Sequence, residues 1–187
     1  MDNENKKKRV NHGKIFEKFV EKSCLYQDVD YTRLRDAGYQ GSEHNVKNKR
    51  FTIRNICDCI LIWRGVTIFA EVKRDGKSRA FKNISQKRHL NAHNEWEKEK
   101  GLDKKWKPAA GIIAGVIIEI DGQYFFLSIP VLDDMELNIG KKSFNALDAR
   151  QYGIAISTIV HPRKKTASLD MANLFKDVHS KFIKKGQ

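Results

Sequence analysis

The chain of 187 residues has only three cysteines and lacks any long apolar run. An odd and small number of cysteines excludes a disulfide framework and favours a reducing compartment. The most apolar stretch, residues 109–118, contains two glycines and is too short to cross a bilayer. The charged residues 1–9 are not followed by the apolar segment of a signal peptide. We therefore expect a cytoplasmic protein with no membrane partner.

Motifs for several other functions are also missing. The glycines that precede a lysine, at positions 13, 76 and 140, lack the spacing of a phosphate-binding loop, so no nucleotide cofactor is expected. His89 and His93 have a zinc-compatible spacing but no adjacent third ligand. Cys57 and Cys59 are two residues apart, on the same face of an expected strand, and are expected to pack in the core. No internal repeat and no linker to a second domain is visible.

Acidic residues are scarce relative to basic ones. The 36 lysines and arginines exceed the 23 aspartates and glutamates by 13 charges. Such an excess favours a polyanionic partner, and DNA is the commonest. The basic residues form dispersed clusters, each of which alone is explained by a solvated face. Their sum predicts nucleic-acid binding more strongly than any single cluster.

Apolar periodicity predicts an α/β fold, a mixed β-sheet flanked by helices. Residues 1–10 read as a flexible basic arm, residues 11–187 as a single domain, and residues 36–50 as an exposed loop or short stalk. Helices are expected over 13–24, 84–98, 143–151 and 168–184, and strands over 53–63, 66–73, 111–120, 123–129 and 154–160. Met171, Phe175, Val178 and Phe182 form the apolar stripe of the last helix, expected to be core rather than a dimer seam.

The first strand pair carries the chemistry. A two-residue turn at Arg64-Gly65 places position 58 opposite position 71, so Asp58 and Glu71 share one face of the sheet. Because side chains alternate, Lys73 lies on that face too, and the opposite face is apolar. A loop one residue longer would send Asp58 to the other face.

Two opposed carboxylates within apolar strands need a cation between them. Hard oxygen ligands favour Mg²⁺ or Mn²⁺, and Mg²⁺ keeps several waters, one of which can attack phosphorus. Lys73 could activate that water or neutralise charge on the phosphate. The chemistry indicated is metal-assisted phosphodiester hydrolysis. The alternative is a plain ion pair between Glu71 and Lys73 beside a solvated Asp58.

The spacing from Asp58 to Glu71-Val72-Lys73 resembles the PD-(D/E)xK nuclease core, which is restriction-endonuclease-like. Residues 11–17 resemble the Gly-x-x-x-Glu helix start of the RecU-type Holliday junction resolvase family, and residues 69–73 its catalytic strand. Residues 77–81, 83–84, 86–90, 115–118, 124–127, 141–144 and 169–170 are also similar to that family, in order.

The resemblance implies an Mg²⁺-dependent endonuclease, bacterial or phage-encoded, that acts as a homodimer on four-way DNA junctions. It implies that Asp58 and Glu71 bind metal, that Glu17 completes or steers the metal site, that Lys73 assists attack and that Gln86 lies beside the scissile phosphate. The basic residues expected to contact DNA around this site are Lys14, Arg74, Lys77, Arg79, Lys82, Lys87 and Arg88. The segment 36–50 is shorter than the stalk of the family.

Two alternatives remain open from the sequence. The same nuclease core could act on ordinary duplex DNA, as a restriction or repair nuclease does. The chain could also be a non-catalytic basic DNA-binding protein in which Glu71 and Lys73 form only a salt bridge.

Overall fold

The structure is a computed structural model that describes residues 11–34, 57–84 and 111–183. Its elements, in chain order, are α1 (His12–Leu25), β1 (Asp30–Arg33), β2 (Cys59–Trp63), β3 (Val66–Asp75), β4 (Ser78–Ala80), the 3₁₀ turn η1 (Phe81–Asn83), β5 (Ile112–Ile120), β6 (Gln123–Ser128), α3 (Ile129–Leu137), β7 (Ser143–Asn145), α4 (Ala146–Tyr152), β8 (Ile154–Ala155), β9 (Thr158–His161), the 3₁₀ turn η2 (Pro162–Lys164), β10 (Thr166–Leu169), α5 (Met171–Val178) and the π-helical turn η3 (His179–Ile183). The basic arm at 1–10, the loop at 36–50 and the helix expected over 84–98, apart from Ile84, lie outside the described residues.

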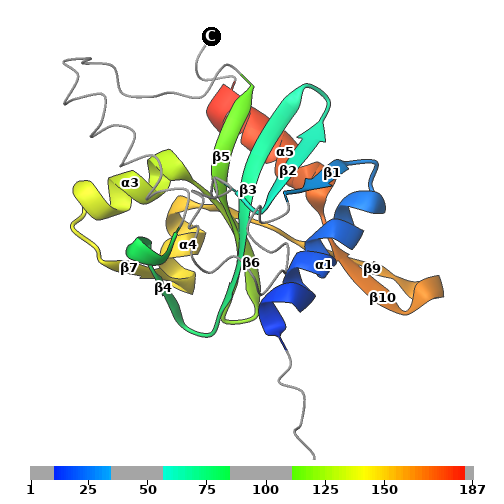
Figure 1. Cartoon of the computed structure of the whole chain (residues 1–187), viewed down its shortest axis with the longest axis horizontal. Coiled ribbons are helices and arrows are strands. Elements are labelled where there is room, and N and C mark those ends of the chain that lie inside the picture. Colours follow the sequence, from blue (N-terminus) through cyan, green and yellow to red (C-terminus); the bar gives the residue numbers. More distant parts are fainter. Residues whose placement is uncertain (1–10, 35–56, 85–110, 184–187) are drawn as a thin grey trace, which may run out of the picture.

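A six-stranded mixed sheet forms the centre of the described protein, in the order β1-β2-β3-β5-β6-β8. Strands β3 and β5 are parallel, and every other neighbouring pair is antiparallel. Two smaller antiparallel pairs, β4 with β7 and β9 with β10, stand beside it. Figure 1 shows α3 and α4 on one side of this sheet and α1 on the other. The predicted α/β class, a mixed sheet flanked by helices, is confirmed.

Two tight turns fix the register of the sheet. Arg64 and Gly65 have φ values of 46° and 81°, and Asp121 and Gly122 have 52° and 69°. Positive φ at both central residues is the turn geometry that matches the twist of antiparallel strands. Trp63 therefore pairs with Val66, and Ile120 pairs with Gln123. The register predicted for the first hairpin is confirmed as far as the Cys59–Ala70 pair.

Each face of the sheet packs on its own apolar cluster, because neighbouring side chains of a strand point to opposite faces. On β5, Ile117 joins the cluster under α1 and α5, and Val116, Ile118 and Ile120 join the cluster under α3 and α4. Cys57 and Cys59 are buried, as expected, and Cys59 belongs to the cluster under α1 and α5. The stripe of the last helix is core: Met171, Phe175 and Val178 are buried, and Phe182 packs against the same cluster.

Several elements differ from the sequence-based expectation. The strand β1 was missed because its four residues are mostly exposed and show no apolar alternation. Helix α3 was missed because it is short and begins with Pro130 in its first turn. The predicted helix over 143–151 begins only at Ala146, where Asn145 and Asp148 form a reciprocal capping box.

The predicted strand 154–160 is two strands of different sheets, β8 and β9. The predicted helix 168–184 begins only at Met171, where the Asp170 carboxylate accepts a hydrogen bond from the N–H of Asn173. Ile15 of α1 is exposed although it is apolar. None of the helices in the described ranges combines the length and apolar character that a membrane span requires.

Gly115 tests the packing of the sheet centre. A Cβ atom there would lie 2.5 Å from the Phe126 ring and 2.6 Å from the carbonyl oxygen of Leu127. Because the backbone cannot move without breaking the β5–β6 ladder, Gly115→Ala should lower the free energy of unfolding by about 1–3 kcal/mol in urea denaturation. Gly76 has nothing within 4 Å of its ideal Cβ. The matched change Gly76→Ala should therefore stay within about 0.5 kcal/mol of the parent. Equal effects of the two changes would contradict this packing.

Candidate active site

Three charged side chains from β3 and from the residue that precedes β2 meet on one face of the sheet. The ammonium group of Lys73 lies 3.0 Å from Oε1 of Glu71 and 3.3 Å from Oδ2 of Asp58. Glu71 and Lys73 share the face because they are two residues apart on β3. The structure thus brings together the three residues that the hairpin register predicted.

The β2–β3 ladder ends at this cluster. The chain bends at Asp58, whose N–H donates to the carbonyl of Ala70 at 3.0 Å and whose carbonyl accepts from the N–H of Leu34 at 3.0 Å. Asp58 is therefore not a ladder partner of Glu71, as a continued strand would have made it. Its carboxylate turns toward β3 and accepts the N–H of Val72 at 2.8 Å. The acid is held at the end of the ladder by backbone geometry as well as by charge.

The three side chains of the cluster differ in solvent exposure. The side chain of Glu71 is 1% exposed, that of Lys73 is 24% exposed and that of Asp58 is 39% exposed. A carboxylate as buried as Glu71 keeps its charge only beside a cation or strong donors. Because Asp58 is the most exposed of the three side chains, an ion or ligand can reach the cluster from solvent.

The charge of Lys73 is set by two opposing influences. Burial, the largest single influence, lowers its pKa, but the negative charges of Glu71 and Asp58 and the hydrogen bonds to them together raise the pKa above its ordinary value. Lys73 is therefore a cation throughout the physiological range, and it compensates one of the two negative charges that flank it.

The donor set suits a hard divalent cation. Asp58 and Glu71 direct oxygen atoms at one point, the position of the Lys73 ammonium. Mg²⁺ is commonly held by one or two carboxylates and otherwise by water and phosphate oxygens. Asp58 and Glu71 could hold such an ion. Among the described residues, no group of three or more His, Cys, Asp or Glu side chains is close enough together to do so.

Glu17 does not complete such a group. Its carboxylate binds Nη2 of Arg33 at 2.8 Å, across from α1 to β1. Arg33 pairs with Cys59, and the N–H of the next residue, Leu34, bonds to Asp58. Glu17 is thus tied to the strand end beside Asp58, and its observed partner is an arginine. The sequence signal that could have predicted the Glu17–Arg33 contact is strand β1. Its Tyr-Thr pair is typical of strands, but two residues are too short a pattern to identify one.

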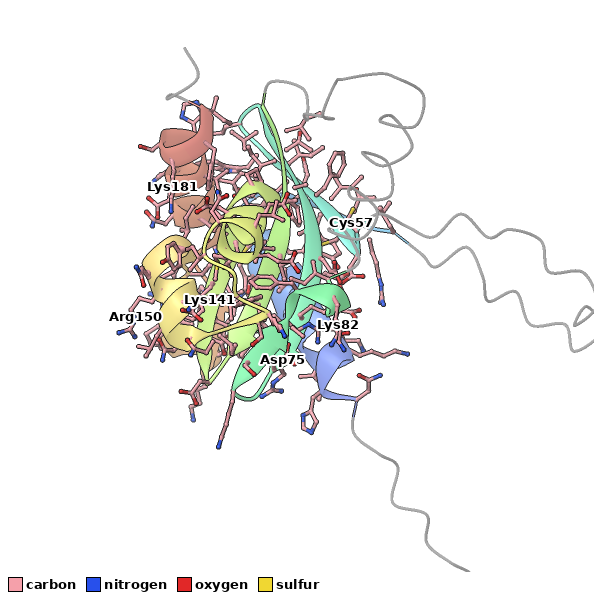
Figure 2. The ribbon with its side chains drawn as sticks, turned by 90° about the vertical axis from the view of Figure 1, so that its left-hand side faces the viewer. Cys57, Asp75, Lys82, Lys141, Arg150 and Lys181 are labelled. Atoms are coloured by element: carbon pink, nitrogen blue, oxygen red, sulfur yellow. The ribbon has the colours of Figure 1, made fainter. Side chains whose placement is uncertain are left out.

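The residues expected to contact DNA differ in whether they already form an ion pair within the described protein. Lys14, Lys77 and Lys82 are exposed and form no ion pair within the described parts of the chain. Figure 2 shows Lys82 and Asp75 toward the same side as Cys57, and Arg150 and Lys181 toward the other. Gln86, Lys87 and Arg88 lie outside the described residues.

The two arginines of this set are held by acids. Arg74 binds Glu119 at 2.9 Å and lies 3.4 Å from Nδ1 of His12, so it belongs to the α1 face. Arg79 contacts Asp75 at 3.3 Å and donates to the carbonyl of Asn83 at 2.9 Å, on the face of Lys73. The two arginines therefore do not form one continuous contact surface.

Comparison with known proteins adds a likeness to solved structures. No family model matches the chain, and a search of curated proteins finds no match. Among solved structures, the chain is similar to Hjc, a Holliday junction resolvase from the archaeal hyperthermophile Archaeoglobus fulgidus. The identity is 14%, the TM-score is 0.46, and the alignment covers 76% of this chain and 95% of that one. A likeness at this score assigns neither fold nor activity, so both are argued from the residues of this chain.

Removing the central cation should destabilise the protein. Lys73→Met would leave the charges of Asp58 and Glu71 facing each other, one of them buried, at a cost of about 2–4 kcal/mol in the free energy of unfolding. Chemical denaturation of the metal-free protein at neutral pH measures the loss. Lys142 is exposed, so Lys142→Met should change that free energy by less than about 0.5 kcal/mol. A loss no larger for Lys73→Met than for this control would refute the interaction.

The same interaction has a pH dependence of defined sign. The pKa of Lys73 in the folded protein is raised above its ordinary value of 10.5. Its stabilising contribution is therefore fully present below pH 10.5 and is lost as the pH rises through the higher folded-state pKa. The stability difference between parent and Lys73→Met should shrink above that pH, as measured by denaturation in a series of alkaline buffers. A difference that grows with pH would show the opposite shift.

Proposed function

We propose that this chain is a structure-selective DNA endonuclease that resolves four-way (Holliday) junctions by metal-dependent phosphodiester hydrolysis. The observation that supports it is the meeting of Asp58, Glu71 and Lys73 at the end of the β2–β3 ladder. The net charge of +13 supports a DNA partner. The motif resemblance to the RecU-type resolvases within the PD-(D/E)xK superfamily agrees with both.

In this proposal Asp58 and Glu71 would hold Mg²⁺ or Mn²⁺. When bound, such an ion supplies an acidified water and neutralises charge that develops on the phosphate. The residues of the chain itself position the reaction. The N–H of Val72 fixes the Asp58 carboxylate, the buried Glu71 gives the site a rigid inner wall, and Lys73 places a positive charge beside the reacting phosphate.

Selectivity in this proposal comes from shape, since phosphate contacts carry no base sequence. A homodimer would bring two sites to the two symmetric strands of a junction. Lys14, Lys77 and Lys82 would contact phosphates near the cut, and Gln86, Lys87 and Arg88 would extend this contact. Glu17 would steer the site through Arg33. The protein would work as a single nuclease domain in the cytoplasm.

One observation favours a second candidate. Lys73 already satisfies both carboxylates, at 3.0 and 3.3 Å, as a plain salt bridge in a non-catalytic DNA-binding protein would. The cleavage assay below separates this candidate from the nuclease, and it also separates junction from ordinary duplex substrates.

Asp58→Asn should abolish cleavage. With Mg²⁺ in single-turnover conditions, the parent should cut a synthetic four-way junction and leave a linear duplex of the same sequence intact. Loss of one charged group that stabilises the transition state should slow the reaction at least about 100-fold. Asp121→Asn is the matched control, because asparagine accepts the positive φ of that turn.

Each outcome of this assay selects one function. Junction cleavage that Asp58→Asn removes and Asp121→Asn keeps supports the resolvase. Equal cutting of junction and duplex selects a general duplex nuclease, and binding without cutting selects the non-catalytic protein.

The free lysines near the site should contribute to affinity without sequence preference. Changing Lys77 and Lys82 to glutamine should lower the slope of log affinity against log salt by about 2, one unit for each lost phosphate contact. Fluorescence anisotropy with labelled duplex and junction DNA measures the slope. The matched double change of the exposed Arg150 and Lys176 to glutamine should leave it near the parent value. Identical slopes for the two pairs would refute the placement of DNA over β4 and η1.

A further inference from the structure

A two-stranded ribbon projects from the described protein outside the main sheet. It comprises β9, η2 and β10, residues 158–169, and is here called the basic ribbon. Among the described residues its strands pair only with each other, from Thr158–Leu169 at the base to His161–Thr166 near the tip. Figure 1 shows it extending past α1 on the side away from α3 and α4. Residues 162–167 at the tip are all exposed.

The base of the basic ribbon is fixed on α1. Leu169 and Ser168 are buried, and the N–H of Leu169 donates to Oγ of Ser23 at 2.9 Å. Gln27 donates to the carbonyl of Leu169 and accepts the N–H of Ala172 at 3.0 Å. The tip is therefore carried on a rigid support and does not depend on a core of its own.

The charge of the basic ribbon has one sign. Arg163, Lys164 and Lys165 stand at its tip, and the sequence has no acidic residue from position 149 to position 169. None of the three forms an ion pair within the described residues. Elsewhere, Arg33, Arg74 and Arg79 are each paired with an acid. Three adjacent unpaired cations repel one another, and their arrangement is relieved by a polyanion.

The side chains at the tip are partly ordered. The ammonium of Lys164 lies 4.6 Å from the centre of the Tyr26 ring, and the His161 ring lies 5.1 Å from the same ring. Nε2 of His161 is 2.8 Å from Oγ of Ser168 on the opposite strand. These contacts hold the strands in register and reduce the entropy that a lysine loses when it binds.

We propose that the basic ribbon is a second DNA-binding element, which grips the phosphate backbone of a duplex arm at a distance from the cut. The inference rests on the proposed function for the nature of the partner. A two-stranded ribbon has the width that a DNA groove accepts. Its residues offer cations and two threonine hydroxyls to phosphates, and few groups suited to reading bases.

The position of the basic ribbon on α1 sets its distance from the strand end beside Asp58. The helix carries Glu17, which is tied to the strand end beside Asp58, and ends next to Tyr26, which contacts the ribbon. Tyr26, the C-cap of α1, lies nine positions after Glu17, which is a rise of about 14 Å along the helix. In this proposal the ribbon therefore contacts a duplex arm rather than the scissile phosphate.

The test is a triple change at the tip: Arg163→Gln, Lys164→Gln and Lys165→Asn, where asparagine suits the left-handed backbone of position 165. Binding to a labelled four-way junction and to a labelled duplex is measured in EDTA by fluorescence anisotropy over a series of salt concentrations. The slope of log affinity against log salt should fall by about 2–3, and affinity near 0.1 M salt should weaken about 10- to 100-fold.

The control removes the same number of exposed charges from α4, α5 and η3. Arg150→Gln, Lys176→Gln and Lys181→Gln together should change the slope and the affinity much less, and both triple variants should keep the parent melting temperature. Equal loss in the two variants would show that only total charge matters and would overturn the proposal. An unchanged slope in the ribbon variant would also overturn it.

The measurements distinguish failure of the proposed function from failure of the ribbon proposal. If DNA is not the partner, the parent protein will not bind DNA, and the ribbon proposal falls with it. If the parent binds DNA without cutting it, the nuclease proposal is wrong, and the two triple variants still decide the ribbon proposal. If only the ribbon proposal is wrong, the parent will bind and cut, and the ribbon variant will bind like the charge-matched control.

Discussion

The charge of Glu71, almost wholly removed from water, is the constraint on which the site depends. A buried carboxylate costs several kcal/mol unless a cation or a set of donors compensates it. Here the compensation comes from Lys73, two residues along the same strand, and Lys73 in turn draws in Asp58 from the neighbouring chain segment. The pleat of one strand thus places acid and base together, and the adjoining turn decides which second acid joins them. The β-sheet therefore sets the relative positions of the two acids and the lysine.

The sheet is stabilised on both sides of this cluster by different means. On one edge, β3 is backed by β5 over nine parallel positions, from Thr67 to Asp75. On the other edge its partner ends at Cys59, and the N–H of Val72 bonds to a side chain instead of a strand. Elsewhere in the described protein, Glu119 and Asp75 hold Arg74 and Arg79 in place. The lysines near the site and the cations of the basic ribbon are exposed and form no ion pair among the described residues, so they place excess positive charge at the surface.

The features that sequence predicted best have local causes. The Arg64-Gly65 and Asp121-Gly122 dipeptides require positive φ, so they fix both turns and, through the register, the meeting of Asp58, Glu71 and Lys73. The features it missed depend on distant partners. Strand β1 exists because β2 offers it an edge, β9 separates from β8 because β10 pairs with it, and Arg33 takes Glu17 only once α1 and β1 are adjacent. The bend at Asp58 belongs to this group, since only the end of the ladder defines it.

The pairing of β3 with β5 has a consequence for biosynthesis. All three charged residues lie within one hairpin of 18 residues, Asp58 to Asp75, whereas the partner strand ends at Ile120, 45 residues later. At translation rates of about 5–20 residues per second, the hairpin leaves the ribosome about 2–9 s before that strand is complete. Hairpins close within microseconds. The acids and the lysine can therefore find one another while all are still hydrated, and the nascent chain buries Glu71 together with its cation instead of as a bare anion.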